Sequence, residues 1–169
     1  YFRSGWQVRP FDFHYFEELY EVRIVLELEA VKRLCDRPAG ELPAPLEDLR
    51  RTWMVTPEER LQDGRAVSLL DERFHCQLVE ATGNREMARM HAEVSEKIRI
   101  IRRLDFTQGP RVEATYAEHA QILGAILSRR QEEAQLMLRA HIEVSKAEVR
   151  KITLHMLHSA RQRAMAGQG

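Results

Sequence analysis

Apolar residues along this chain recur every three or four positions, the spacing that places side chains on one face of an α-helix. Stripes of this kind run through about residues 13–36, 43–55, 85–105, 111–128 and 131–163. In the first stripe the apolar positions are Phe16, Leu19, Tyr20, Ile24, Leu28, Val31 and Leu34. No segment shows the strict apolar–polar alternation of a half-buried β-strand. The pattern therefore predicts an all-α fold.

Proline, glycine and capping residues mark where the predicted helices begin and end. Residues 37–40 and 108–110 contain Pro-Ala-Gly and Gln-Gly-Pro, which stop helices. Thr56-Pro57-Glu58-Glu59 is a helix-start pattern, and its helix is expected to continue to Thr82, with Asp63-Gly64 as a candidate break. Gly83-Asn84 ends that helix and caps the next. These signals predict an antiparallel bundle of six or seven helices.

Composition limits the class of protein. The 169 residues suit one domain, and 44% of them are apolar, enough for a single core. Lys plus Arg equals Asp plus Glu at 26 each, so the chain lacks the basic excess of a nucleic-acid-binding domain. Two cysteines and the absence of an apolar run of about 18 residues predict a cytoplasmic protein without a membrane span. We expect the domain to cover residues 11–165, with a frayed tail at 166–169.

Four polar residues interrupt the apolar stripes. Asp71 and His75 lie four positions apart and so share a helix face. That face otherwise carries Val67, Leu70, Phe74 and Leu78. His119 and His141 lie in two further apolar stripes, so three helices each direct a polar group toward one interior. A buried aspartate needs a neutralising partner, and carboxylate with imidazole suits zinc, nickel or another first-row divalent ion.

The same four residues are also compatible with purely structural roles. A histidine on an apolar face is often a hydrogen-bonded core residue, and a buried aspartate often pairs with arginine. Because four such groups lie on inward stripes, their spacing supports a metal site and these structural roles about equally. We interpret the remaining histidines as packing or surface residues, namely His14, His91, His155 and His158.

Six short motifs add a resemblance to a known family. They are Leu19–Arg23, Leu26–Ala30, Asp71–His75, Ala81–Asn84, Glu118–Leu123 and the Ala134, Met137, Arg139, Ala140 and His141 pattern. In this order they resemble the FCD domain, the ligand-binding domain of the FadR subfamily of GntR transcription regulators. The resemblance extends roughly from Phe16 to Val149. It is weakest between Cys35 and Asp71, where the chain has several prolines and an unusual Trp53-Met54.

The resemblance implies that Asp71, His75, His119 and His141 bind a divalent metal, most simply zinc, and these are the four residues that the stripes select. It further implies a homodimer that senses a small carboxylate effector. Operator DNA would be read by an N-terminal winged-helix domain that these residues do not include. Gly5-Trp6-Gln7-Val8 resembles the last strand of such a wing, although residues 1–10 are equally consistent with a linker.

Three arginines are candidates for binding the carboxylate. Family resemblance places an arginine at the position of Arg23 in the effector pocket. Arg99 and Arg102 lie three positions apart on a later helix, and the alternative for all three arginines is a solvated or ion-paired surface residue. The predicted function is therefore metal-dependent sensing of an organic acid, without catalysis. The competing hypotheses are a metalloenzyme that activates water at the ion and a dimerisation bundle with a structural metal.

Overall fold

The computed structural model describes residues 12–38, 40, 42–105 and 109–166, and within these residues the only regular secondary structure is helical. The elements in chain order are α1 (Phe13–Cys35), α2 (Ala44–Trp53), the short 3₁₀-helix η1 (Pro57–Glu59), α3 (Gly64–Glu80), α4 (Arg85–Asp105), α5 (Gly109–Leu127) and α6 (Gln131–Ala166). The all-α prediction is confirmed. Residues 1–10 and 167–169, on which the wing, linker and most of the tail predictions fall, lie outside the described residues.

Local side-chain chemistry explains where several helices begin. The carboxylate of Asp12 accepts the backbone N–H of Tyr15 at 3.0 Å before α1. Asp63 accepts the N–H of Ala66 at 2.9 Å before α3. The side chain of Asn84 accepts the N–H of Met87 at 3.1 Å before α4. Each contact satisfies a backbone donor that the first helical turn leaves unpaired.

The segment after Thr56 differs from a continuous helix. The expected capping box forms, because Glu59 accepts the backbone N–H of Thr56 at 3.0 Å, but the helix ends at Glu59. Tertiary contacts to α5 then hold the chain away from helical geometry. Leu61 donates its N–H to the Tyr116 hydroxyl at 3.2 Å, and Arg60 pairs with Glu113 at 2.9 Å. The candidate break at Asp63-Gly64 is therefore a real one, and α3 begins there.

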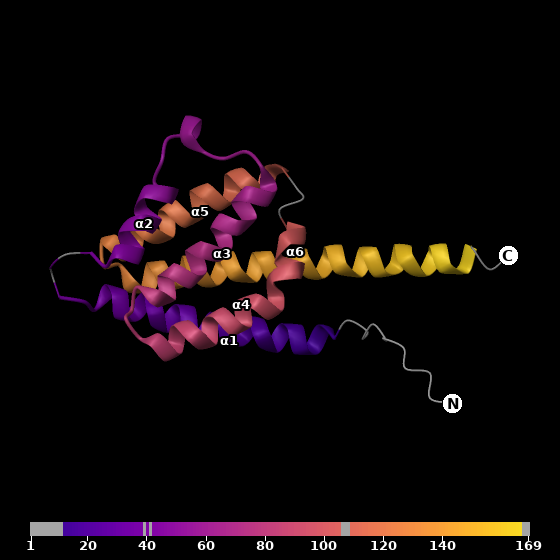
Figure 1. Cartoon of the computed structure of the whole chain (residues 1–169), viewed down its shortest axis with the longest axis horizontal. Helices are drawn as coiled ribbons and strands as arrows, with labels where there is room; N and C mark the ends of the chain where they lie inside the picture. Colours follow the sequence, from indigo (N-terminus) through magenta and orange to yellow (C-terminus); the bar gives the residue numbers. More distant parts are fainter. Residues whose placement is uncertain (1–11, 39, 41, 106–108, 167–169) are drawn as a thin grey trace, which may run out of the picture.

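Helix α6 is the axis of the bundle. It packs against α1, α4 and α5, while α3 packs against α4 and α1. Helix α2 lies across the outside and contacts α3 and α5. In Figure 1 the C-terminal part of α6, in yellow, continues beyond the ends of the other helices. The surrounding helices therefore enclose the interior positions of α3, α5 and α6, where the candidate ligands lie.

Crossing a membrane requires a helix that is both long and apolar. None of the helices among the described residues combines the two properties.

Candidate metal centre

The four residues selected from the sequence meet in the interior. Asp71 and His75 come from α3, His119 from α5 and His141 from α6, and all four are buried. One potential ligand atom of each lies within 4.8 Å of the others. The helical stripes that predicted inward-facing positions thus bring carboxylate and imidazole donors from three helices to one point.

The distances between these donors fit a single small cation. Nε2 of His141 lies 3.2 Å from Nε2 of His119 and 3.3 Å from Nε2 of His75. Oδ1 of Asp71 lies 3.4 Å from Nε2 of His119 and 3.6 Å from Nε2 of His75. Ligands bound tetrahedrally at about 2.0–2.2 Å from a zinc ion are separated from one another by about 3.3–3.6 Å. The donor set and its spacing therefore match a first-row divalent ion.

Burial prepares these groups for coordination. Burial lowers the pKa of His75 to about 4, although Glu27 and Asp71 act in the opposite direction. Burial also holds the pKa of His119 well below its ordinary value. Burial alone would raise the pKa of Asp71, but the guanidinium of Arg102, which donates from Nη2 to Oδ2, helps to hold that pKa well below its usual range. Near pH 7 Asp71 is thus a carboxylate and His75 and His119 are neutral imidazoles, the forms that bind metals.

Carboxylates outside the centre orient two of the three imidazoles. Nδ1 of His75 lies 2.6 Å from Oε2 of Glu27, and Nδ1 of His141 lies 2.5 Å from Oε2 of Glu118. An ionised carboxylate only accepts hydrogen bonds, so Nδ1 carries the proton in both rings. The lone pairs on Nε2 then face the centre. This carboxylate–histidine arrangement is typical of histidines that bind metals.

Glu27 is a buried hub that the sequence analysis did not identify. Besides His75, its carboxylate accepts from Nε2 of His91 at 2.9 Å and from Nε of Arg23 at 2.7 Å. Burial alone would raise its pKa, but His75 and Arg23 hold the pKa well below its ordinary value. A signal was present, because Glu27 interrupts the apolar stripe of α1 as Asp71 interrupts that of α3. His91, interpreted from the sequence as a packing residue, is also a hydrogen-bond donor to this hub.

The three candidate arginines have different surroundings. Arg23 and Arg102 are buried, at 1% and 5% exposure, beside Glu27 and Asp71. The side chain of Arg99 is 41% exposed and pairs with Glu72 at 2.8 Å. The structure therefore brings Arg23 and Arg102 to the interior cluster and leaves Arg99 in an ion pair at the surface.

Several buried polar atoms next to the cluster lack a partner within the described residues. They include one terminal nitrogen each of Arg23 and Arg102, in each case Nη1. These groups are close in space, since the guanidinium of Arg23 lies 5.5 Å from the centre of the Tyr20 ring and Arg102 influences the Tyr20 pKa. Buried donors are seldom left unpaired. These two nitrogens are therefore free to donate further hydrogen bonds in the interior.

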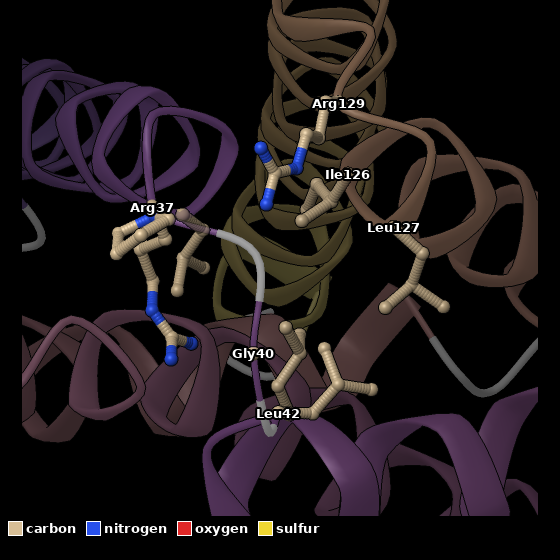
Figure 2. A pocket seen from close by; sticks show the side chains of 9 residues that line it. Arg37, Gly40, Leu42, Ile126, Leu127 and Arg129 are labelled. Atoms are coloured by element: carbon tan, nitrogen blue, oxygen red, sulfur yellow. The ribbon is translucent and has the colours of Figure 1, made fainter.

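Two surface cavities differ in whether they reach the candidate ligands. One, of about 210 Å³ between α5 and α6, is lined by Glu118, Gln121, Ile122, Met137, Ala140, His141 and Val144, and so reaches a candidate ligand. Figure 2 shows another, of about 240 Å³, which lies where the end of α1, the start of α2 and the α5–α6 turn meet. It is lined by Leu34, Arg37, Pro38, Gly40, Leu42, Leu46, Ile126, Leu127 and Arg129. Its lining includes none of the four candidate ligands.

Comparison with known families identifies the class of domain. The FCD domain family matches residues 18–144, three-quarters of the chain, and the chain belongs to this family. The fold agrees with solved FCD structures. The metal-free FCD domain of TM0439 superposes with a TM-score of 0.68 at 22% identity, covering 85% of this chain and 96% of that one. Its Zn²⁺-bound form gives 0.66 at 23% identity with the same coverage.

Two curated relatives are similar to this chain in sequence. The Nta operon transcriptional regulator of Aminobacter aminovorans is 29% identical over 141 residues, which is 83% of this chain and 64% of that protein. The HTH-type transcriptional regulator YdhC of Bacillus subtilis, whose own function is uncharacterised, is 27% identical over 139 residues, 82% of this chain and 62% of that protein. The matched part of the chain thus spans less than two-thirds of the length of these relatives.

Proposed function

We propose that this chain is the effector-sensing domain of a transcription regulator and that Asp71, His75, His119 and His141 bind a divalent ion in it. The buried cluster of four donors at ligand-to-ligand spacing carries the proposal. Zinc is the first choice, because imidazole nitrogen suits it and a Zn²⁺-bound domain of the same fold is known. Nickel or another first-row ion is compatible with the same donors.

The effector is a small carboxylate that binds beside the ion. Bound metal would supply a positive charge and open coordination positions for a carboxylate oxygen. The chain itself supplies the other contacts, since Arg23 and Arg102 each have an unpaired Nη1 in the interior region beside Tyr20. Each free Nη1 can donate a charge-assisted hydrogen bond to a carboxylate oxygen of the effector. Arg99 is left out of this site because it pairs with Glu72.

In the whole regulator the domain forms part of a homodimer. The relatives are named as transcriptional regulators and are longer than the matched segment, so a DNA-binding domain is expected elsewhere in the protein. A twofold-symmetric dimer would place two such domains on two half-sites of an operator. Effector binding to the helical domain would alter the relative position of the two DNA-binding domains and so regulate transcription.

Metal analysis and calorimetry test the proposal. The purified chain should contain close to one equivalent of a first-row divalent ion, and the loaded chain should bind members of a panel of mono- and dicarboxylates. Arg23→Ala should weaken that binding by about 1.5–3 kcal/mol, because the anion loses a charged donor. Arg99→Ala is the matched control and should bind as the wild type does. A chain that takes up no ion, or binds no carboxylate when loaded, contradicts the corresponding part of the proposal.

A further inference from the structure

His119 differs from the other two imidazoles of the centre in what holds it. Nδ1 of His75 and Nδ1 of His141 each contact a carboxylate, at 2.6 Å and 2.5 Å. Nδ1 of His119 is fully buried and has no hydrogen-bond partner among the described residues. If Nε2 of His119 binds a cation, Nδ1 carries a proton that nothing nearby accepts. Another interaction must therefore fix the orientation of this ring.

Aromatic rings surround His119 on its face and its edge. The Phe74 ring is stacked on it at 3.7 Å between centroids with an interplanar angle of 6°. The Trp53 ring meets it edge-on at 4.2 Å and 81°. Trp53 is itself packed against Tyr116 at 4.9 Å and against Phe74 at 5.8 Å. Contacts on two sides leave the imidazole little freedom to rotate, because any rotation would collide with one of the rings.

Trp53 is the contribution of α2 to this arrangement. It is the last residue of α2, its side chain is 1% exposed, and α2 provides none of the four candidate ligands. Through Trp53, a helix on the outside of the bundle contacts a ligand in its interior. Phe74, by contrast, is on α3 between Asp71 and His75 and is placed by the same helix as two of the ligands.

We propose that Trp53 is a positioning residue for His119. With Phe74 it holds the imidazole so that Nε2 lies 3.4 Å from Oδ1 of Asp71 and 3.2 Å from Nε2 of His141. Ring packing thereby does for His119 what Glu27 and Glu118 do for the other imidazoles by hydrogen bonding. This inference rests on the metal site of the proposed function. It adds that metal affinity depends on the ring of Trp53 at the end of α2.

Substitutions of Trp53 test the role, with a second buried residue of α2 as the matched control. Trp53→Leu keeps much of the volume and removes the ring, Trp53→Phe keeps a ring, and Leu49→Ala perturbs α2 at another fully buried position. For each protein, zinc affinity is measured by competition with a chelator. The absorption spectrum of the Co²⁺-loaded form reports the number of ligands, and the melting temperature of the metal-free form reports the stability of the fold.

Trp53→Leu should weaken zinc binding about 10- to 100-fold, the effect typical of removing a group that orients a metal ligand. Its Co²⁺ spectrum should change in shape and intensity as His119 leaves the ion. Trp53→Phe should restore most of the affinity and the spectrum. Leu49→Ala should lower the melting temperature while keeping the wild-type affinity and spectrum.

The fluorescence of Trp53 provides a second measurement, and it leaves Trp53 itself unchanged. The chain has two tryptophans, Trp6 and Trp53, so in a Trp6→Phe protein the emission comes from Trp53 alone. Co²⁺ binding should quench this emission in proportion to metal uptake, because Trp53 contacts a ligand ring. Unchanged affinity and spectrum in Trp53→Leu, or equal losses in Leu49→Ala, would overturn the positioning role alone. A wild-type chain that binds neither Zn²⁺ nor Co²⁺ would overturn the metal site and this inference together.

Discussion

On the α1 and α4 side of the candidate centre, charged groups hold the ligands, whereas on the side that faces α2 aromatic rings hold His119. Glu27 links His75 to His91 and Arg23, and Arg102 pairs with Asp71, all in the interior. Around His119 the contacts come from Trp53 and Phe74. Removing one charge from a buried ionic network costs much stability, because the remaining charges are left uncompensated. Replacing one aromatic ring in a packed cluster costs less stability, because no charge is left unpaired. The two sides should therefore respond differently to substitution.

The ionic side should show the largest effect. Glu27→Gln keeps the shape of the side chain but removes the charge that Arg23 and two histidines share. We expect the free energy of unfolding of the metal-free protein to fall by about 3–5 kcal/mol, the range for breaking a buried ion pair. Urea denaturation measures it. The control is Glu29→Gln in the same helix, which breaks a surface pair with Arg33 and should leave stability unchanged. Equal effects in the two variants would show that the hub is not structurally important.

Metal removal tests both sides together. Ion binding only to the folded state adds about 3–4 kcal/mol of apparent stability when the free ion exceeds its dissociation constant 100- to 1,000-fold. Chelation should therefore lower the melting temperature, and His119→Ala should make the protein insensitive to the chelator. His155→Ala, at an exposed position of α6, should keep the wild-type response. A melting curve that chelator does not shift would count against an ion at this centre.

The pH dependence of the metal-free protein should follow the buried imidazoles. In the folded protein the pKa of His75 is about 4, against 6.5 when unperturbed. The unfolded chain therefore binds more protons between these pH values, and stability falls as the pH is lowered from 6.5 toward 4. At about 1.4 kcal/mol per pH unit the loss from His75 alone is roughly 3 kcal/mol. His119, whose pKa is also lowered by burial, adds to the loss in the same direction.

Denaturation at a series of pH values between 7.5 and 4.5 measures this dependence. His75→Asn should reduce the slope, because one of the two imidazoles with a lowered pKa is gone. His14→Asn, at an exposed position, should leave it unaltered. A slope that is flat between pH 6.5 and 5, or steeper in His75→Asn, would contradict the assignment of these protons to the centre.

The sequence predicted the charged side better than the aromatic side. A charged or polar residue on an apolar stripe is visible in one helix, as with Asp71, and the same logic applies to Glu27. Which of two nearby arginines turns inward is not visible in this way. Arg99 and Arg102 lie on the same helix, but one faces Glu72 and the other Asp71, and only the packing of α3 on α4 decides this.

The contact of Trp53 with His119 could not be predicted from local pattern. The two residues are 66 positions apart, and their contact depends on how α2 crosses α3 and α5. The same region held the least accurate helix boundaries, because the contacts of Arg60 and Leu61 with α5 override the local helix-start signal. Helical spacing fixes which face is buried, whereas the crossing of helices fixes which buried side chains meet.

The smallest effect is expected at the α5–α6 turn, away from both sides of the centre. A substitution there should change stability without changing zinc affinity, and so serves as a reference for the two sides. Arg129 has φ of 56°, a left-handed conformation that is unfavourable for a residue with a Cβ atom. Two backbone hydrogen bonds close this helix end. Arg130 donates its N–H to the Ala125 carbonyl at 2.8 Å, and Arg129 donates its N–H to the Ile126 carbonyl at 3.0 Å. A helix end of this kind usually has glycine at the position of Arg129. Arg129→Gly should therefore raise the free energy of unfolding by about 0.5–1 kcal/mol, since relief of strain exceeds the entropy that glycine adds to the unfolded chain. Zinc affinity should stay at the wild-type value, because Arg129 belongs to the cavity of Figure 2 and not to the centre. A change in zinc affinity in this variant would mean that the turn is coupled to the centre through α5 and α6. Residues far from the ligands would then also influence how the ligands are held.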